Sequence, residues 1–216
     1  GWILMKDGKM SKSKGNVVYP DFLVDRYGLD SLRYYLMREI PFGSDGIFTP
    51  EDYVTRTNSD LANDLGNLLN RTVAMINQYL EGQIPALASG KNEFDAELEE
   101  TAANAITAYA EALDHLQFNV ALQNIWKLIS RTNKYIDETT PWILAREEKI
   151  EELSNVLAHL VESLRVTGIL LRPFLVETPD RMAEQLGLDL ETDMSWDKLT
   201  YGEFPEGRKV VKKGKP

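Results

Sequence analysis

The chain has 216 residues, of which 43% are hydrophobic, and a formal net charge of −10. One large domain or two small ones with a core of ordinary size are therefore expected. The absence of Cys excludes disulfides and thiolate metal sites, and two isolated histidines, His115 and His159, predict that no metal is bound. No apolar stretch approaches the ~18 residues of a membrane span and no signal-peptide pattern opens the chain, so we expect a cytoplasmic protein without a membrane partner.

Charge is distributed unevenly along the sequence. The first sixteen residues contain four lysines opposed only by Asp7, and five of the eight residues 208–215 are basic. Residues 93–152 contain thirteen Asp and Glu against five Lys and Arg. The acidic total argues against a general nucleic-acid binder, and we interpret the acidic middle as a solvated helix face.

The first 48 residues predict short elements of different kinds. Residues 2–5 form an apolar strand, and the small and basic residues that follow, up to 18, form a loop that contains no helix. Residues 20–40 have the apolar spacing of a helix that is broken near Gly28. The Gly-rich stretch 41–48 has no periodicity and predicts a linker.

A long helix is predicted over residues 50–81. Thr49 can cap its start, the Pro and acidic residues that follow favour the first turn, and Gly82 favours its end. Seven residues share one face at helical spacing, which predicts that this face is buried: Leu61, Leu65, Leu68, Thr72, Met75, Ile76 and Tyr79. The opposite face carries four asparagines, with Arg71 at its edge: Asn63, Asn67, Asn70 and Asn77.

Further helices are predicted over residues 97–116, 119–138, 147–171 and 178–186, with Asn119 as the cap of the second. Trp126 lies among apolar residues in mid-helix and should belong to the core. The fold class expected is all-α: an antiparallel bundle of about five helices over residues 49–216. Residues 1–48 are expected to be the last part of an α/β domain that precedes it, and the opening on Gly1 is interpreted as the start of a piece of a longer protein.

The sharpest chemical signal is the loop Lys9-Met10-Ser11-Lys12-Ser13. Lysines separated by hydroxyl residues on a loop that ends in Gly provide mobile charges and donors, which suit a triphosphate whose charge shifts during reaction. The order KMSKS within GKMSKSKGN resembles the signature loop of class I aminoacyl-tRNA synthetases. The resemblance implies that the five residues bind ATP, which carries Mg²⁺, and that Lys12 acts on its phosphates as the catalytic residue.

Downstream motifs narrow the resemblance to bacterial methionyl-tRNA synthetases. These motifs are DSLRYYL at 30–36, PFGSDG at 41–46, NDLGNLLNR at 63–71 and DETTPW at 137–142. The resemblance implies the C-terminal part of a methionine–tRNA ligase, which binds methionine tRNA at its CAU anticodon through Asn67, Arg71 and Trp142. An amide and a guanidinium four residues apart share a helix face and can bond base edges, and an exposed indole can stack on a base.

Competing interpretations stay open at this stage. A tryptophan after a proline at a helix start is more often a core residue, which would remove Trp142 from the site. Asn63, Asn70 and Asn77 share the helix face but not the motif, and we take them as structural or peripheral. The chain could also belong to another class I synthetase, of leucyl or valyl type, or be a non-catalytic helical module that binds tRNA or protein.

The resemblance also implies parts that the sequence does not contain. Neither histidine begins a HIGH motif, the other ATP-binding signature of class I synthetases. We therefore expect no catalysis by this chain alone, with ATP and methionine bound only together with the missing catalytic domain. The basic residues near the end fit either a linker to a further RNA-binding domain or a strand that returns to the catalytic core, which we favour.

Overall fold

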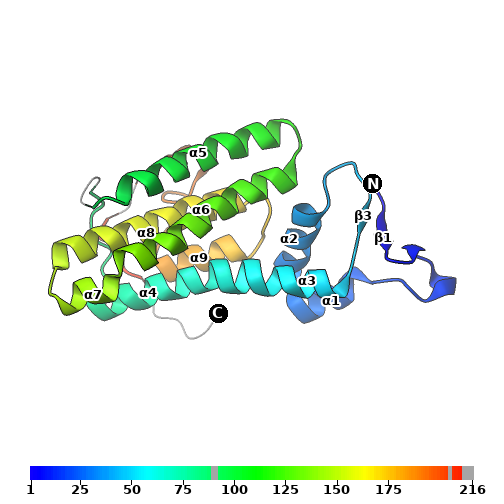
Figure 1. The fold of residues 1–216 in the computed structure, drawn as a ribbon, viewed down its shortest axis with the longest axis horizontal. Coiled ribbons are helices and arrows are strands. Elements are labelled where there is room, and N and C mark those ends of the chain that lie inside the picture. Colours follow the sequence, from blue (N-terminus) through cyan, green and yellow to red (C-terminus); the bar gives the residue numbers. More distant parts are fainter. Residues whose placement is uncertain (89–91, 204–205, 211–216) are drawn as a thin grey trace.

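The computed structural model describes residues 1–88, 92–203 and 206–210. Figure 1 shows an elongated molecule with a helical bundle at one end and a small sheet with two helices at the other. A helical run from α3 (Pro50–Arg56) through a π-helical segment (Thr57–Gly66) to α4 (Asn67–Tyr79) links the two ends. The expected class, a helical bundle preceded by a short strand region, is confirmed. The boundary between residues 48 and 49 stays a prediction.

The small sheet holds the N-terminal loop in place. Strand β1 (Ile3–Met5) lies between β2 (Gly8–Lys9), which is antiparallel to it, and β3 (Gly46–Ile47), which is parallel. Helices α1 (Pro20–Tyr27) and α2 (Leu29–Glu39) form the connection between the two parallel strands. Gly28, with φ +86°, takes the chain from one helix into the next, as the predicted break requires.

Two expectations for this region are wrong. The stretch predicted as a linker contains β3, whose pairing residues lie some forty positions from β1, and a strand of two residues is too short to show alternation. The loop predicted to lack any helix contains a 3₁₀ turn at Lys12–Lys14, which Gly15 ends with φ +70°. Single turns of this type leave little periodic signal in a sequence.

An aromatic cluster joins the sheet to the long helical run. Leu23, Tyr35, Phe48 and Tyr53 are buried against one another, with ring centroids of Tyr35 and Phe48 5.4 Å apart and those of Tyr35 and Tyr53 5.2 Å apart. Ser31 donates a 2.9 Å hydrogen bond to the Tyr53 hydroxyl. Helix α2 is thus fixed to α3 by packing and by a buried polar contact.

The long helical run begins and ends as predicted but is not α-helical throughout. The Thr49 hydroxyl accepts the Asp52 N–H at 3.1 Å, and Gly82 has φ +80° just after the last turn. The predicted apolar face is buried, apart from partial exposure of Leu61 and Tyr79. The π-helical segment was not predicted: the Asn67 N–H donates to the Ala62 carbonyl, five residues back, and no residue type marks such a turn.

The bundle consists of long helices that alternate in direction (Figure 1): α5 (Asp95–Asp114), α6 (Phe118–Thr139) and α8 (Ile150–Leu171), with the shorter α9 (Thr178–Leu186). Helix α8 is central, because every residue from 155 to 171 is buried. Trp126 is 7% exposed and packs on the Tyr34 ring at 4.6 Å, which confirms it as a core residue and joins α2 to α6.

Two predicted details of the bundle are wrong. Asn119 does not cap α6, because the helix begins one residue earlier and Gln117 holds the cap position. The helix predicted from 147 begins at Ile150, and a separate short helix, α7 (Pro141–Arg146), precedes it. Glu148, with φ +56°, separates the two helices.

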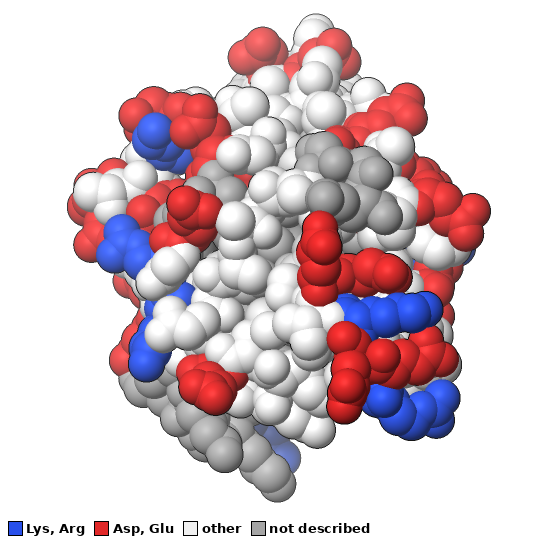
Figure 2. Space-filling view, turned by 90° about the vertical axis from the view of Figure 1, so that its left-hand side faces the viewer, with Lys and Arg blue, Asp and Glu red and all other residues white. Residues whose placement is uncertain are grey.

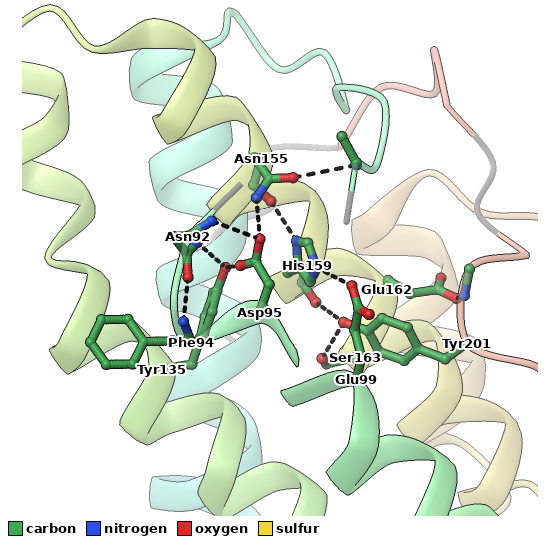
Figure 3. Close-up of polar contacts among 12 residues, drawn as sticks. Asn92, Phe94, Asp95, Glu99, Tyr135, Asn155, His159, Glu162, Ser163 and Tyr201 are labelled. Carbon is green, nitrogen blue, oxygen red and sulfur yellow. Dashed lines mark hydrogen bonds and ion pairs between the residues drawn. The ribbon is translucent and has the colours of Figure 1, made fainter. Parts of the chain in front are cut away.

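A buried polar network joins three helices of the bundle (Figure 3). The Asp95 carboxylate accepts from the Tyr135 hydroxyl at 2.6 Å and from the Asn155 amide at 2.9 Å. His159 is fully buried beside them, with Nδ1 2.9 Å from the Asn155 carbonyl and Nε2 3.1 Å from Glu99. Burial and the neighbouring Asp95 raise the pKa of Tyr135, which keeps it a hydrogen-bond donor. His159 is therefore a satisfied histidine of the bundle core.

A buried ion pair fixes the segment that follows α9. Arg165 and Glu162 are both fully buried and share hydrogen bonds of 2.7 and 2.8 Å. The same guanidinium donates to the carbonyls of Asp193, Lys198 and Thr200 at 2.8–3.0 Å. One side chain of α8 thus holds the turns around the 3₁₀ segment Trp196–Lys198.

The described part of the basic tail pairs with the bundle. Val210 donates to the Gly82 carbonyl at 3.0 Å and Ile84 donates to the Arg208 carbonyl at 2.8 Å. This contact with the connection after α4 differs from the expected strand in the preceding domain. The remaining lysines of the tail, at 212, 213 and 215, lie outside the described residues. Within the described ranges, no helix has the length and apolar composition needed to cross a membrane.

Candidate functional site

The loop of residues 9–13, named the phosphate loop because it is expected to bind the phosphates of ATP, follows the hairpin β1–β2. Lys9 Nζ lies 4.1 Å from the centre of the Trp2 ring, a cation–π contact. The hydroxyls of Ser11 and Ser13 are 2.8 Å apart, and Lys12 is exposed in the 3₁₀ turn between them. Met10 faces inward, where it lines a small apolar cavity of about 140 Å³ with residues of β1 and α1. Met10 thus holds the loop against the apolar cavity, while the lysines and the Ser13 hydroxyl lie at the surface.

Asn16 organises this loop, a role that the sequence analysis missed. Its amide nitrogen donates to both Asp7 carboxylate oxygens, at 2.9 and 3.1 Å, and its amide oxygen accepts the Ser11 N–H at 2.8 Å. The Gly15 N–H closes the turn on the Ser11 carbonyl at 3.1 Å. An Asn directly after Gly at the end of a loop was the available signal, since Asn side chains often bond nearby backbone groups in turns.

Asn67 and Arg71 lie one turn apart at the start of α4. Asn67 is exposed, and Arg71 is partly exposed with its Nη2 3.6 Å from Asp137 of α6. From Asp137 the chain continues through Thr140 and Pro141 to Trp142, so this ion pair links α4 to the turn that carries the tryptophan. The phosphate loop lies at the opposite end of the long axis from α7 (Figure 1).

Trp142 is 46% exposed, and the competing interpretation as a core residue is wrong. Thr140, just before Pro141, has φ +44° and ψ +62°, a left-handed conformation that β-branched residues rarely adopt. This turn ends α6 and starts α7 within two residues. Its geometry directs the indole to the surface, where it offers a flat apolar face.

A groove of about 560 Å³ runs along the asparagine face of the long helical run. Asn63, Asn67 and Asn70 line one wall, and residues from the α1–α2 junction and from the start of α9 line the other. The three side chains are exposed. Asn77 differs because its amide donates to the Val73 carbonyl at 2.9 Å, which is a structural role within α4.

The π-helical segment forms the base of this groove, and α6 contacts it through Asn133. Asn133 of α6 donates from its amide to the Asp64 carbonyl at 3.1 Å, and this contact satisfies a backbone acceptor within the widened turns. Burial and the nearby Asp60 raise the pKa of Asp64. The asparagine wall is thus held by α6, the helix that also leads to Trp142.

Acidic side chains surround the end of the bundle where α7 lies. Figure 2 shows that end face, with Asp and Glu crowded around its edge and fewer Lys and Arg. Glu147 and Glu148 are exposed between α7 and α8, and Glu151 and Glu152 are exposed in the first turn of α8. Such a field repels phosphates and other anions.

Comparison with known proteins identifies two families along the chain. Residues 1–73 match the family described as "tRNA synthetases class I (M)", and residues 84–211 match the "Anticodon binding domain of methionyl tRNA ligase". The whole chain is 63% identical to a methionine–tRNA ligase of Enterococcus faecalis and 58% identical to that of Bacillus subtilis, and covers 32% of each. It therefore spans about a third of the length of these curated relatives.

Solved structures agree with this assignment. The Mycobacterium tuberculosis methionyl-tRNA synthetase in complex with methionyl-adenylate superposes with a TM-score of 0.87 at 30% identity, over 99% of this chain and 42% of that one. The apo form of the same enzyme gives 0.86 at 28% identity, over 98% and 41%. These matches favour neither a leucyl or valyl enzyme nor a non-catalytic helical module. The chain belongs to the class I methionyl-tRNA synthetase family and carries its anticodon-binding domain.

Proposed function

We propose that this chain reads the CAU anticodon of methionine tRNA and supplies the phosphate loop with which a methionine–tRNA ligase forms methionyl-adenylate. The observation that carries the proposal is the exposure of Trp142, at 46%, on a bundle that buries Trp126. An exposed indole, held by a strained turn, provides a stacking surface for a base. The ion pair of Arg71 with Asp137 connects α4 to the end of α6 that leads to this turn, and Asn67 and Arg71 are able to bond base edges.

Anticodon recognition follows from the chemistry of the three side chains. The Asn67 amide offers both a donor and an acceptor to a base edge, and the Arg71 guanidinium offers a planar fork of donors. Asp137 meets Arg71 at a single nitrogen, Nη2, so the remaining N–H groups can turn toward RNA. Trp142 stacks on a base that has been splayed out of the loop, a contact worth roughly 1–3 kcal/mol.

The phosphate loop acts at the other end of the molecule. In adenylate formation the methionine carboxylate attacks the α-phosphorus of ATP and pyrophosphate leaves, so negative charge grows on the leaving phosphates. Lys12, exposed between Ser11 and Ser13, can approach those oxygens and stabilise the transition state. Lys9 and Met10, held by Trp2 and by the apolar cavity, keep the loop attached while it acts.

The loop residues do not form a magnesium site of their own. Asp7 supplies the sole carboxylate among the first sixteen residues, and both of its oxygens accept from Asn16. Mg²⁺ therefore enters as part of the ATP substrate. A single phosphate loop cannot orient methionine and ATP for in-line attack, so the 216-residue chain alone should show no methionine-dependent ATP–pyrophosphate exchange. Action in translation places the protein in the cytoplasm.

The test uses RNA hairpins with a CAU loop or a permuted loop, with binding to the chain measured by fluorescence anisotropy. The CAU hairpin should bind more tightly, and Trp142→Ala should raise its Kd roughly 5- to 150-fold, the equivalent of 1–3 kcal/mol. Trp196→Ala is the matched control, because Trp196 is also exposed, at 54%, and packs near Tyr109 away from α7. Equal affinity for both loops, or an unchanged Kd in Trp142→Ala, would reject the proposal.

A further inference from the structure

Two side chains of helix α2, Asp30 and Arg33, form hydrogen bonds with the connection between α8 and α9. The Asp30 carboxylate accepts three backbone N–H groups, from Val176 at 2.7 Å, Glu177 at 3.0 Å and Thr178 at 2.6 Å, and also the Thr178 hydroxyl at 2.6 Å. Three of the four bonds use the same oxygen, Oδ2. Arg33, one turn later, donates to the Phe174 carbonyl at 2.6 Å and to the Pro173 carbonyl at 3.2 Å.

Asp30 acts as the cap of α9, although it lies nearly 150 residues away in the sequence. Glu177, at the cap position of α9 itself, makes no capping hydrogen bond with its side chain. The negative charge of Asp30 also faces the positive end of the α9 dipole. Burial opposes ionisation, but the bonds from the Thr178 hydroxyl and the three N–H groups outweigh it and lower the pKa of Asp30. The carboxylate is therefore ionised at neutral pH.

The position of α2 gives this contact a wider effect. Helices α1 and α2 directly follow the phosphate loop, while α8 and α9 belong to the bundle. The surface of the bundle proposed to read the anticodon, formed by Asn67, Arg71 and Trp142, is called the anticodon face. The loop and α7 lie at opposite ends of the long axis (Figure 1), so a small change in the angle between α2 and the bundle displaces one site strongly relative to the other. Contacts of α2 with the bundle set this angle.

We propose that Asp30 is a positioning residue that fixes the orientation of the anticodon face relative to the phosphate loop, so that one tRNA molecule can engage both ends. This inference rests on the proposed function. An intact tRNA has to satisfy both sites at once, whereas an anticodon hairpin needs only one of them and adenylate formation only the other. Misplacement by about 1 Å can cost a factor of 10² in rate, so intact tRNA should be the sensitive substrate.

The experiment compares the Asp30→Asn variant of the full-length enzyme with the unchanged parent enzyme. The amide keeps the size of the side chain and one acceptor oxygen, which can take the place of Oδ2. It removes the negative charge and puts an NH2 group opposite the Val176 N–H, so at least that bond is lost and the three that remain no longer have a charged acceptor. Asp189→Asn is the matched control, because Asp189 also accepts two backbone N–H groups and a threonine hydroxyl, all within its own turn. Three quantities are measured: ATP–pyrophosphate exchange, inhibition by a CAU hairpin, and kcat/KM for charging intact tRNA.

Asp30→Asn should lower kcat/KM for intact tRNA by about tenfold or more. Exchange should stay within about twofold of the parent enzyme, and Asp189→Asn should leave all three quantities unchanged. Because Asp30 lines the groove opposite Asn67, the hairpin inhibition constant should change by a smaller factor than kcat/KM for intact tRNA. Unchanged charging in Asp30→Asn, or a parallel fall of all three quantities, would overturn the inference.

A second variant covers the case in which Asp30→Asn does not fold. Thr178→Val removes only the hydroxyl bond to Asp30, so it should give the same selective loss at smaller size, and no selective loss there would overturn the inference. If the parent enzyme itself is not inhibited by the CAU hairpin, the failure belongs to the proposed function instead.

Discussion

Replacement of Arg71 by Ala should weaken RNA binding with little effect on folding. The ion pair of Arg71 with Asp137 is 3.6 Å long and its side chains are 41% and 71% exposed, so it contributes less than about 1 kcal/mol to the free energy of unfolding. A guanidinium that reads a base edge contributes roughly 1–3 kcal/mol of discrimination. The Kd for a CAU hairpin should therefore rise about 5- to 150-fold while the urea midpoint of unfolding hardly moves.

Arg71→Lys distinguishes base recognition from attraction to phosphate. Lysine keeps the charge but loses the planar fork, so it should bind the hairpin almost as weakly as the alanine variant. A phosphate contact would behave differently: lysine would restore binding, and alanine would lower the slope of log K against log salt by about one unit. Arg26→Ala, at an exposed arginine of α1, serves as the control. Restored binding in the lysine variant, or a loss of unfolding free energy above about 2 kcal/mol in Arg71→Ala, would refute this reasoning.

Three further outcomes are expected. In the full-length enzyme Lys12→Ala should slow adenylate formation by about 10²-fold or more without weakening methionine binding, as stopped-flow fluorescence would show, whereas Lys14→Ala, in the same exposed turn, should have a much smaller effect. Arg165→Met should lower the free energy of unfolding by about 3–5 kcal/mol because it leaves the Glu162 charge buried without a counter-charge. Adding Glu162→Leu should recover only part of that loss in urea titrations, because the carbonyls of Asp193, Lys198 and Thr200 still lack their donor. Folding lowers the pKa of Asp30, so its contribution to stability is present above the unfolded pKa of about 3.9 and is lost as the pH falls through the folded-state pKa. Between pH 5 and pH 3 the melting temperature of Asp30→Asn should therefore fall less steeply than that of the parent.

The sequence predicted the parts of the fold that depend on local pattern. Periodicity placed the helices of the bundle, and the start at Thr49 and the end at Gly82 follow from cap chemistry that acts within one turn. The exposure of Trp142 was reached only through the family resemblance, since position after a proline favours burial. The roles of Asn67, Arg71, Trp142 and the phosphate loop stay predictions.

The features that sequence missed depend on contacts between distant residues. Strand β3 exists because β1 offers backbone partners to it, and the capping of α9 by Asp30 joins residues about 150 positions apart. The hydrogen bonds of the Asn16 side chain span five to nine residues across a loop without periodicity. None of these contacts leaves a repeat or a spacing that a linear reading detects, because the partners are specified by tertiary structure.

The π-helical segment affects how this protein can tolerate insertions and deletions. Turns closed by hydrogen bonds between residues five apart hold more residues than α-helical turns. The aromatic cluster fixes which face of α3 is buried, and the bundle core fixes which face of α4 is buried. Residues 57–66 accommodate the mismatch between these two orientations. Loss of one residue there could be absorbed by a return to α-helical geometry with both hydrophobic anchors kept. The asparagines of the groove would then rotate around the helix axis, so a length change that spares folding would alter what the groove can bind.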